Sequence, residues 1–153
     1  MAQKENFMVY LVSNHNVELY VRVLSIKEPF ASLIKDGKKK IETRSWKTNY
    51  RGEIYIHASL TKSKLDERIM ELNKLVTPMP GYVLCKCTLK DCVYMDETFI
   101  KDIQKNRKEY LYGHYEAGRY AWIIENVVVI DPFLAKGKLG IWHFDEKEGS
   151  KNE

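Results

Sequence analysis

The segment from residue 24 to residue 59 constrains the fold of this chain most, because strand, helix and turn patterns follow one another closely within it. Its sequence is LSIKEPFASLIKDGKKKIETRSWKTNYRGEIYIHAS. The stretch 20–26 alternates and is rich in β-branched residues, which predicts a strand. Pro29 then stands at a position that favours the first turn of a helix, and Gly37 ends that helix. Alternation resumes afterwards, so two further strands are predicted, near residues 40–46 and over 53–59.

Two more helices are predicted in the middle of the chain. Apolar residues recur at helical spacing between Leu65 and Val76, which predicts the longest helix over 60–76, with Thr61 or Ser63 as its cap. Asp96 opens a shorter predicted helix over 96–111.

The predicted strands outnumber the helices. They include 81–95, 119–133 with a break near Glu125 and Asn126, and 140–145; the apolar stretch 7–12 fits a strand or a short helix equally well. This pattern predicts an α+β domain with a mixed or antiparallel sheet curled into a small barrel, and it does not fit regular βαβ alternation.

The length of 153 residues and a hydrophobic fraction of 44% fit one compact domain. We expect an N-terminal extension over 1–18, whose structure the pattern leaves open, the domain over 19–145, and a charged, frayed tail over 146–153. No apolar run is long enough for a membrane span, and the first residues lack the pattern of a signal peptide, so a soluble cytoplasmic protein without a membrane partner is expected.

The cysteines and histidines do not predict a metal site. The three cysteines and four histidines lack CxxC and HxxxH spacing. Cys85 and Cys87 alternate with apolar residues and are predicted to be reduced thiols buried in the core. No metal and no cofactor is therefore expected.

Positive charge is concentrated within the opening segment. Between Lys35 and Arg51 there are seven basic and two acidic residues, a net charge of +5, whereas the whole chain carries +4. Alternation places Glu42, Arg44 and Trp46 on one face of the predicted strand, which favours an exposed strand or a polar cleft. A solvated turn with an ordinary surface ion pair is the alternative.

These residues resemble the signature of the ASCH domain family (activating signal cointegrator homology). The resemblance covers roughly 20–142 and rests on Gly37, Lys39, Glu42 and Arg44 in a Gly-x-Lys-x-x-Glu-x-Arg arrangement, together with Pro29-Phe30, Trp46, Tyr50-Arg51-Gly52, His57-Ala58-Ser59, Trp122 and Trp142. It implies a PUA-like fold, a small curled β-barrel with peripheral helices, and a cleft lined by the segment from Lys39 to Trp46.

The resemblance leaves more than one activity open. Some members of the wider family bind nucleic acid, small bacterial members hydrolyse acetylated cytidine nucleosides, and ribonuclease activity has been proposed for others. The deacetylating members carry a threonine nucleophile where this chain has Glu42, although Lys39 is kept. Glutamate cannot form that acyl intermediate by the hydroxyl route, so hydrolysis would need a water activated by Glu42 or a desolvated Lys39 as general base.

The preferred prediction is a cleft that binds RNA, another single-stranded nucleic acid or a modified nucleoside. The predicted contacts are Lys39, Arg44 and Arg51 to phosphate, Trp46, Tyr50 or Tyr120 by stacking, and Glu42, His57 and Ser59 within the cleft. Glu42 would orient Arg44 or read a base edge, and His57 could instead be a satisfied core histidine. Trp122 and Trp142 are expected in the core. A protein-interaction module using the tail or the 65–76 helix is a third possibility, and the pattern does not disclose the oligomeric state.

Overall fold

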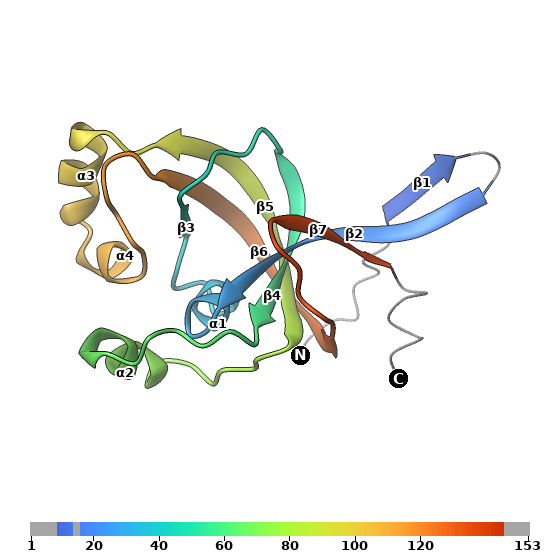
Figure 1. Ribbon diagram of the computed structural model, residues 1–153, viewed down its shortest axis with the longest axis horizontal. Helices are drawn as coiled ribbons and strands as arrows, with labels where there is room; N and C mark the ends of the chain where they lie inside the picture. The colour runs from blue at the N-terminus through green and yellow to red at the C-terminus, as the bar shows by residue number, and fades with distance from the viewer. Residues whose placement is uncertain (1–8, 14–15, 146–153) are drawn as a thin grey trace.

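The structure of the chain is a computed structural model that describes residues 9–13 and 16–145 (Figure 1). The predicted charged tail 146–153 lies outside the described residues. Within the predicted N-terminal extension, β1 (Val9–Ser13) pairs antiparallel with the first part of β2 (Asn16–Lys27). The described part of the stretch 7–12 is therefore a strand and not a helix.

A single mixed sheet forms the body of the protein. Its other strands are β3 (Ile41–Arg44), β4 (Gly52–Ser59), β5 (Tyr82–Tyr94), β6 (Tyr120–Leu134) and β7 (Ile141–Asp145). The order is β1-β2-β4-β5-β6-β3, and β7 pairs with β2 outside this path. The β2–β4 pair is parallel and the other pairs are antiparallel, so the predicted α+β class with a mixed sheet is confirmed.

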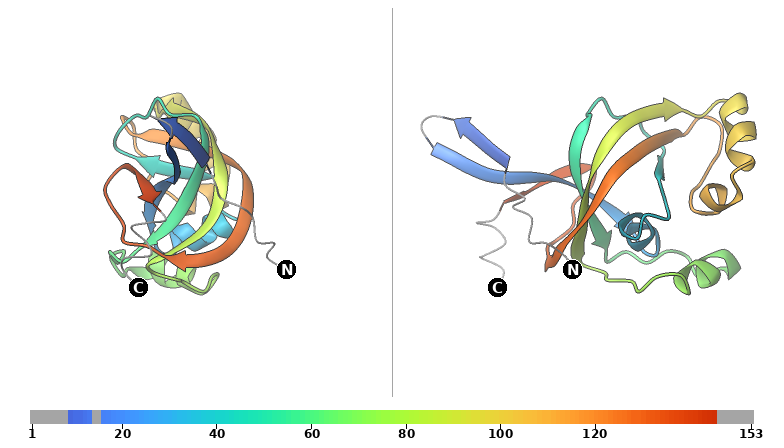
Figure 2. Two further views of the ribbon diagram at one scale, coloured as in Figure 1. Left: turned by 90° about the vertical axis from the view of Figure 1, so that its right-hand side faces the viewer. Right: turned by 180° about the vertical axis from the view of Figure 1, so that it is seen from behind.

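The sheet is strongly curved but does not close into the predicted barrel (Figure 2). Among the described strands, β3 pairs with β6 alone and β7 with β2 alone, so the two ends of the strand path do not meet. The longest pair is β5 with β6, whose register shifts at three places. One shift coincides with Asn126, which has a φ of 54°. The predicted break near Glu125 and Asn126 is thus a bulge inside one continuous strand, and it bends the hairpin.

The four described helices are short. They are α1 (Phe30–Lys35), α2 (Glu67–Asn73), α3 (Glu97–Gln104) and α4 (Arg107–Leu111). The predicted long helix over 60–76 is wrong, because α2 begins only after Asp66, whose side chain accepts a hydrogen bond from Ile69 N at 2.8 Å. Ser63 does not cap a helix, since its hydroxyl donates to the Glu28 carbonyl at 2.7 Å and residues 60–66 form no helix.

The predicted helix over 96–111 is divided into two. Asp96 caps α3 as expected, by accepting from Phe99 N at 2.7 Å. Asn106 then interrupts the helix and caps α4 by accepting from Glu109 N at 3.3 Å. Asparagine competes for backbone donors in this way, which explains the break.

The core lies on the concave side of the sheet, where α1 packs with Leu33 and Ile34 fully buried. Trp122 is 0% exposed and Trp142 5%, and both cysteines of the Cys85-x-Cys87 pair are buried and free, so these core predictions are confirmed. None of the helices in the described ranges is long and apolar enough to span a membrane.

Candidate functional site

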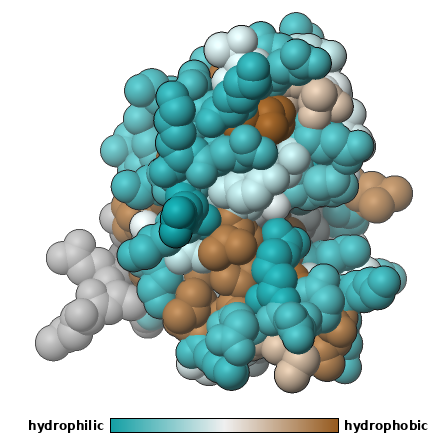
Figure 3. All heavy atoms as spheres, turned by 90° about the vertical axis from the view of Figure 1, so that its left-hand side faces the viewer, coloured by the Kyte–Doolittle hydropathy of each residue, from teal (hydrophilic) through white to brown (hydrophobic). Residues whose placement is uncertain are grey.

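A cleft of about 830 Å³ opens where the carboxyl ends of β2 and β4 meet β3. Its remaining walls are α1, α2 and two loops, 112–119 and 135–140. Figure 3 views the molecule from the side that carries α2, α3 and α4, where hydrophilic side chains surround a smaller apolar area. The predicted residues that line the cleft are Glu42, Arg44, Trp46, His57 and Ser59.

An ion-paired triad lies at the floor of the cleft, where Glu42 and Arg44 line the cleft and Lys39 lies beneath them. Lys39 Nζ lies 3.6 Å from Glu42 Oε1, and Arg44 Nη2 lies 3.1 Å from Glu42 Oε2. Arg44 Nη2 also donates to the Ser25 carbonyl at 2.7 Å, which ties β3 to β2. Gly37, with a φ of +74°, supplies the bend that the sequence requires before Lys39 and Glu42 can meet.

Lys39 belongs to the interior and not to the cleft surface. It is 1% exposed, and its ammonium donates to the Tyr112 carbonyl at 2.5 Å. Burial lowers the pKa of Lys39, while the neighbouring Glu42 and Glu109 oppose that effect. Because Nζ is enclosed by these partners, the structure places Lys39 behind Glu42, where it orients the carboxylate.

Glu109 is a buried acid that the sequence interpretation missed. Its Oε1 accepts a hydrogen bond from Lys40 N at 2.5 Å, which fixes the start of β3 against α4, and burial raises its pKa. The Asn106-x-x-Glu109 spacing signals a helix start, but nothing local indicates that this carboxylate reaches Lys40.

The positive charge of the cleft comes mostly from outside the charged segment. Its basic lining residues are Lys27, Arg44, Arg68, Arg119, Lys136 and Lys138, and Glu42 is the one carboxylate among the lining residues. Of the basic residues in 35–51, Arg44 alone is in this group. Lys-Gly-Lys at 136–138 is a visible signal that could have been used, whereas Arg68 and Arg119 are isolated in the sequence.

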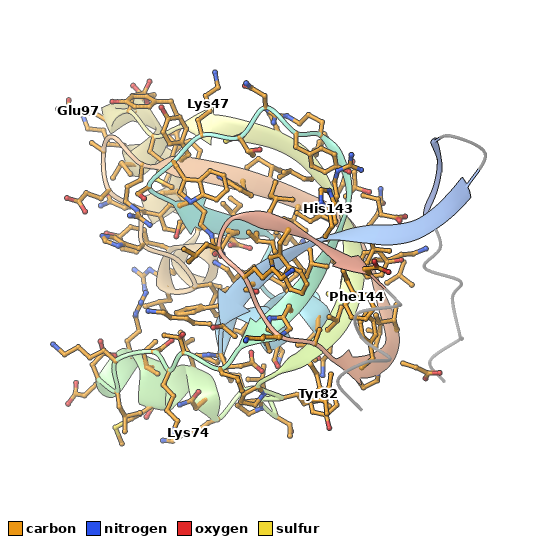
Figure 4. All side chains as sticks on the ribbon, turned by 45° about the vertical axis from the view of Figure 1, so that its right-hand side comes forward. Lys47, Lys74, Tyr82, Glu97, His143 and Phe144 are labelled. Carbon is orange, nitrogen blue, oxygen red and sulfur yellow. The ribbon has the colours of Figure 1, made fainter. Side chains whose placement is uncertain are left out.

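Other members of the charged segment are engaged elsewhere. Lys38 donates to the Leu75 carbonyl at 2.8 Å, and Arg51 lies 3.4 Å from Asp91 on the outer surface. Lys47 is exposed and projects away from the body of the molecule (Figure 4).

The predicted aromatic residues are divided between the cleft and other surfaces. Trp46 lines the cleft, is 37% exposed, and packs edge-on against Trp122 with ring centroids 4.7 Å apart. Tyr50 instead donates its hydroxyl to the Glu53 carbonyl at 2.6 Å, beneath the Arg22 guanidinium. Tyr120 packs against Tyr94, also outside the cleft lining.

His57 connects three chain segments beneath one wall of the cleft. Its Nε2 donates to the carbonyls of Ala135 at 2.8 Å and Gly81 at 3.2 Å, so its Nδ1 accepts from Ser25 Oγ at 2.9 Å. Burial lowers the pKa of His57, which favours this neutral form. His57 is therefore the satisfied core histidine that the sequence left as an alternative, although its ring also borders the cleft.

The carboxylate of Glu42 is largely committed to protein partners. Besides Lys39 and Arg44, it accepts from Thr43 N at 3.0 Å, while Thr43 Oγ1 accepts from His114 N at 2.9 Å. Thr43 also lines the cleft, and its hydroxyl oxygen is engaged with the backbone of loop 112–119. Over the ranges that the structure describes, no three His, Cys, Asp or Glu side chains are grouped as a metal site would require.

Comparison with known proteins agrees with this architecture. The ASCH domain family model matches residues 24–133, and no curated protein matches the sequence. The crystal structure of ASCH from Zymomonas mobilis is similar with a TM-score of 0.55 and 18% identity, covering 86% of this chain and 92% of that chain. Crystal structures of two point mutants of the same protein give a TM-score of 0.55 with 17% and 18% identity, covering 86% of this chain and 94% and 92% of theirs. This chain belongs to the ASCH domain family.

Proposed function

We propose that the cleft binds single-stranded nucleic acid, with RNA or a modified nucleotide as the ligand. The observation that carries this proposal is the composition of the lining, in which six basic side chains and one carboxylate surround the partly exposed Trp46. Basic residues around an aromatic ring provide phosphate contacts and a stacking surface together.

The size of the cleft supports an unpaired ligand. Its volume of about 830 Å³ lies in the range of sites that enclose a ligand of a few rings, whereas a duplex would need an extended open surface. Glu42 has its oxygens directed by Lys39 and Arg44, so it can accept a hydrogen bond from the exocyclic amine of a base.

The test is a binding series with fluorescently labelled oligomers of about ten nucleotides, as single-stranded RNA, single-stranded DNA and duplex, between about 50 and 200 mM salt. A plot of log K against log salt has a negative slope, and Lys27→Gln should make that slope shallower by about 0.7, because it removes one phosphate contact. Lys47→Gln is the matched control, since it removes the same charge from an exposed site outside the cleft lining.

Two results would contradict the proposal. One is the absence of salt-dependent binding to any single strand, and the other is an equal effect of the two substitutions, which would indicate diffuse attraction to a basic protein. Turnover of acetylcytidine by the unaltered protein, lost in Glu42→Gln, would favour the hydrolase alternative instead.

A further inference from the structure

Loop 135–140, with the sequence AKGKLG, forms one complete wall of the cleft. It joins the end of β6 to the start of β7, and all of its residues after Ala135 line the cleft. Lys136 and Lys138 are exposed in this loop, and Leu139 is 99% exposed. The wall therefore presents two ammonium groups beside an uncovered apolar side chain.

The start of the loop is fixed through its backbone. Ala135 donates its N–H to the Gly81 carbonyl at 3.1 Å and accepts from His57 Nε2 at 2.8 Å. His57 Nε2 also approaches the Gly81 carbonyl at 3.2 Å, so the three residues form one closed group of hydrogen bonds. This group holds the loop against β4 and the residue that precedes β5.

Gly137 allows the loop to cross directly over the His57 ring. A Cβ atom at this position would lie 2.9 Å from His57 Cε1 and 3.0 Å from Ser25 Oγ. His57 cannot move aside easily, because Ser25 holds Nδ1 and the Trp142 ring packs edge-on at 5.6 Å. A side chain at 137 would therefore displace the loop and the lysines on either side of it.

Ser25 supports the loop together with His57. Its Oγ donates to His57 Nδ1 at 2.9 Å, accepts from Trp142 Nε1 at 3.0 Å and lies 3.0 Å from the place that a Cβ at Gly137 would take. The pair therefore serves as a support beneath the loop.

We propose that loop 135–140 is the phosphate-contacting wall of the cleft, and that His57 is the positioning residue that sets Lys136 and Lys138 in place for it. This inference rests on the proposed nucleic-acid function and deepens it. Lysine ammonium groups on alternate residues of an exposed loop can follow successive phosphates of a flexible strand.

The experiment measures single-stranded RNA binding and its salt slope for three proteins: Gly137→Ala, Lys136→Gln/Lys138→Gln, and the combined triple variant. The lysine pair variant should make the negative slope of log K against log salt shallower by about 1.4, at about 0.7 for each lost phosphate contact. If the loop acts by placing these lysines, the triple variant binds no more weakly than the pair variant. Leu139→Ala is the control, because it alters the same loop without removing charge or filling space.

His57 is tested by comparing His57→Gln with His57→Ala. Glutamine keeps an amide that can donate to the Ala135 carbonyl, so it should preserve more of the salt slope than alanine does. Thermal unfolding of each variant checks that it is folded. The lysine pair variant changes only exposed side chains, so it tests the phosphate contacts of the loop even if Gly137→Ala does not fold.

Two results would overturn the role of the loop. One is a triple variant whose loss of RNA affinity equals the sum of the losses in Gly137→Ala and in the lysine pair variant. The other is a lysine pair variant whose salt slope is unchanged. In that case Lys27→Gln would still weaken binding, and the proposed function would stand. Failure of the proposed function is recognised separately, because the unaltered protein would then bind no oligonucleotide, and the role of the loop would fall with it.

Discussion

The ammonium of Lys39 lies 3.6 Å from the Glu42 carboxylate with 1% of its side chain exposed, so this ion pair is enclosed by protein. Removing one partner of a buried pair leaves the other charge uncompensated, which typically destabilises a protein by several kcal/mol. Glu42 keeps Arg44 as a second partner, and this limits the effect.

Lys39→Met should therefore lower the free energy of unfolding by about 3 kcal/mol. Lys39→Met/Glu42→Gln should cost less than the two single substitutions added together, by about 1 kcal/mol or more. The measurement is urea unfolding. The midpoints of the variants are compared, provided that the dependence of the unfolding free energy on urea concentration is the same for each. Lys74→Met is the control. Lys74 lies at the end of α2 (Figure 4), and its ion pair with Glu71 is exposed, so its loss should lower the free energy of unfolding by less than about 0.5 kcal/mol. Strict additivity would show that Lys39 and Glu42 are not coupled.

Trp46→Ala should weaken binding of single-stranded RNA by about 5- to 150-fold, corresponding to the loss of one stacked base at about 1–3 kcal/mol. Trp46→Phe should retain most of the affinity, since it preserves an aromatic face beside Trp122. Fluorescence anisotropy with labelled oligomers provides the measurement. Tyr94→Ala removes an aromatic ring that is 55% exposed away from the cleft and should leave affinity unchanged. Equal losses in both alanine variants would argue against stacking in the cleft.

Acidification should destabilise the protein through His57. Its pKa is lowered by burial, so below about 6.5 the unfolded chain takes up a proton that the folded chain does not, and stability falls as the pH approaches the lowered pKa. The groups that contact His57, Ser25, Gly81, Ala135 and Trp142, are neutral. The carbonyls of Ala135 and Gly81 accept hydrogen bonds from the ring and oppose this lowering of the pKa, but burial is the larger effect.

The check is the unfolding free energy of the wild type and of His57→Gln from pH 8 to pH 5. The wild type should have the larger free energy of unfolding at pH 8, and the difference between the two proteins should become smaller toward pH 5. His143 also has a lowered pKa, but it is present in both proteins and cancels in the difference. A difference that stays constant with pH would show that His57 takes up protons equally in the folded and unfolded protein, so that its pKa is not lowered by folding.

The cysteines should differ sharply in reactivity. Burial raises the pKa of Cys85 to about 12 and that of Cys87 well above its usual value, so both lack the reactive thiolate near neutral pH. Cys92 is partly exposed. Iodoacetamide at pH 8 should therefore alkylate the folded protein once, at Cys92, and the denatured protein at all three positions, as peptide mass spectrometry would show. Early modification of Cys85 would indicate frequent opening of the core.

The strands and the core were predictable because their signals are local. Alternation around Cys85 and the apolar setting of Trp122 depend on neighbouring residues, and both predictions are confirmed. The long helix over 60–76 failed because Ser63 bonds to Glu28, a partner distant in the sequence. Helical spacing alone cannot reveal such a competing interaction.

The candidate site was only partly predictable for a similar reason. The motif spacing brings Lys39, Glu42 and Arg44 together, but a turn then carries Tyr50 and Arg51 to another surface. Most of the basic residues in the cleft come from other elements and loops, separated along the chain. No periodicity relates them, since they become neighbours only when the sheet curves.

The hydrogen bond from Trp142 to Ser25 joins positions 117 residues apart, one at the start of the region that the family model matches and the other beyond its end. Contacts of this sequence separation form only after a large loop has been closed, and they slow folding. During synthesis, the chain would thus acquire a complete cleft only once β7 has been made and can pair with β2. A product that stops before Ile141 would contain the whole signature segment and every residue that lines the cleft, but it would lack β7 and the hydrogen bond from Trp142 that supports Ser25.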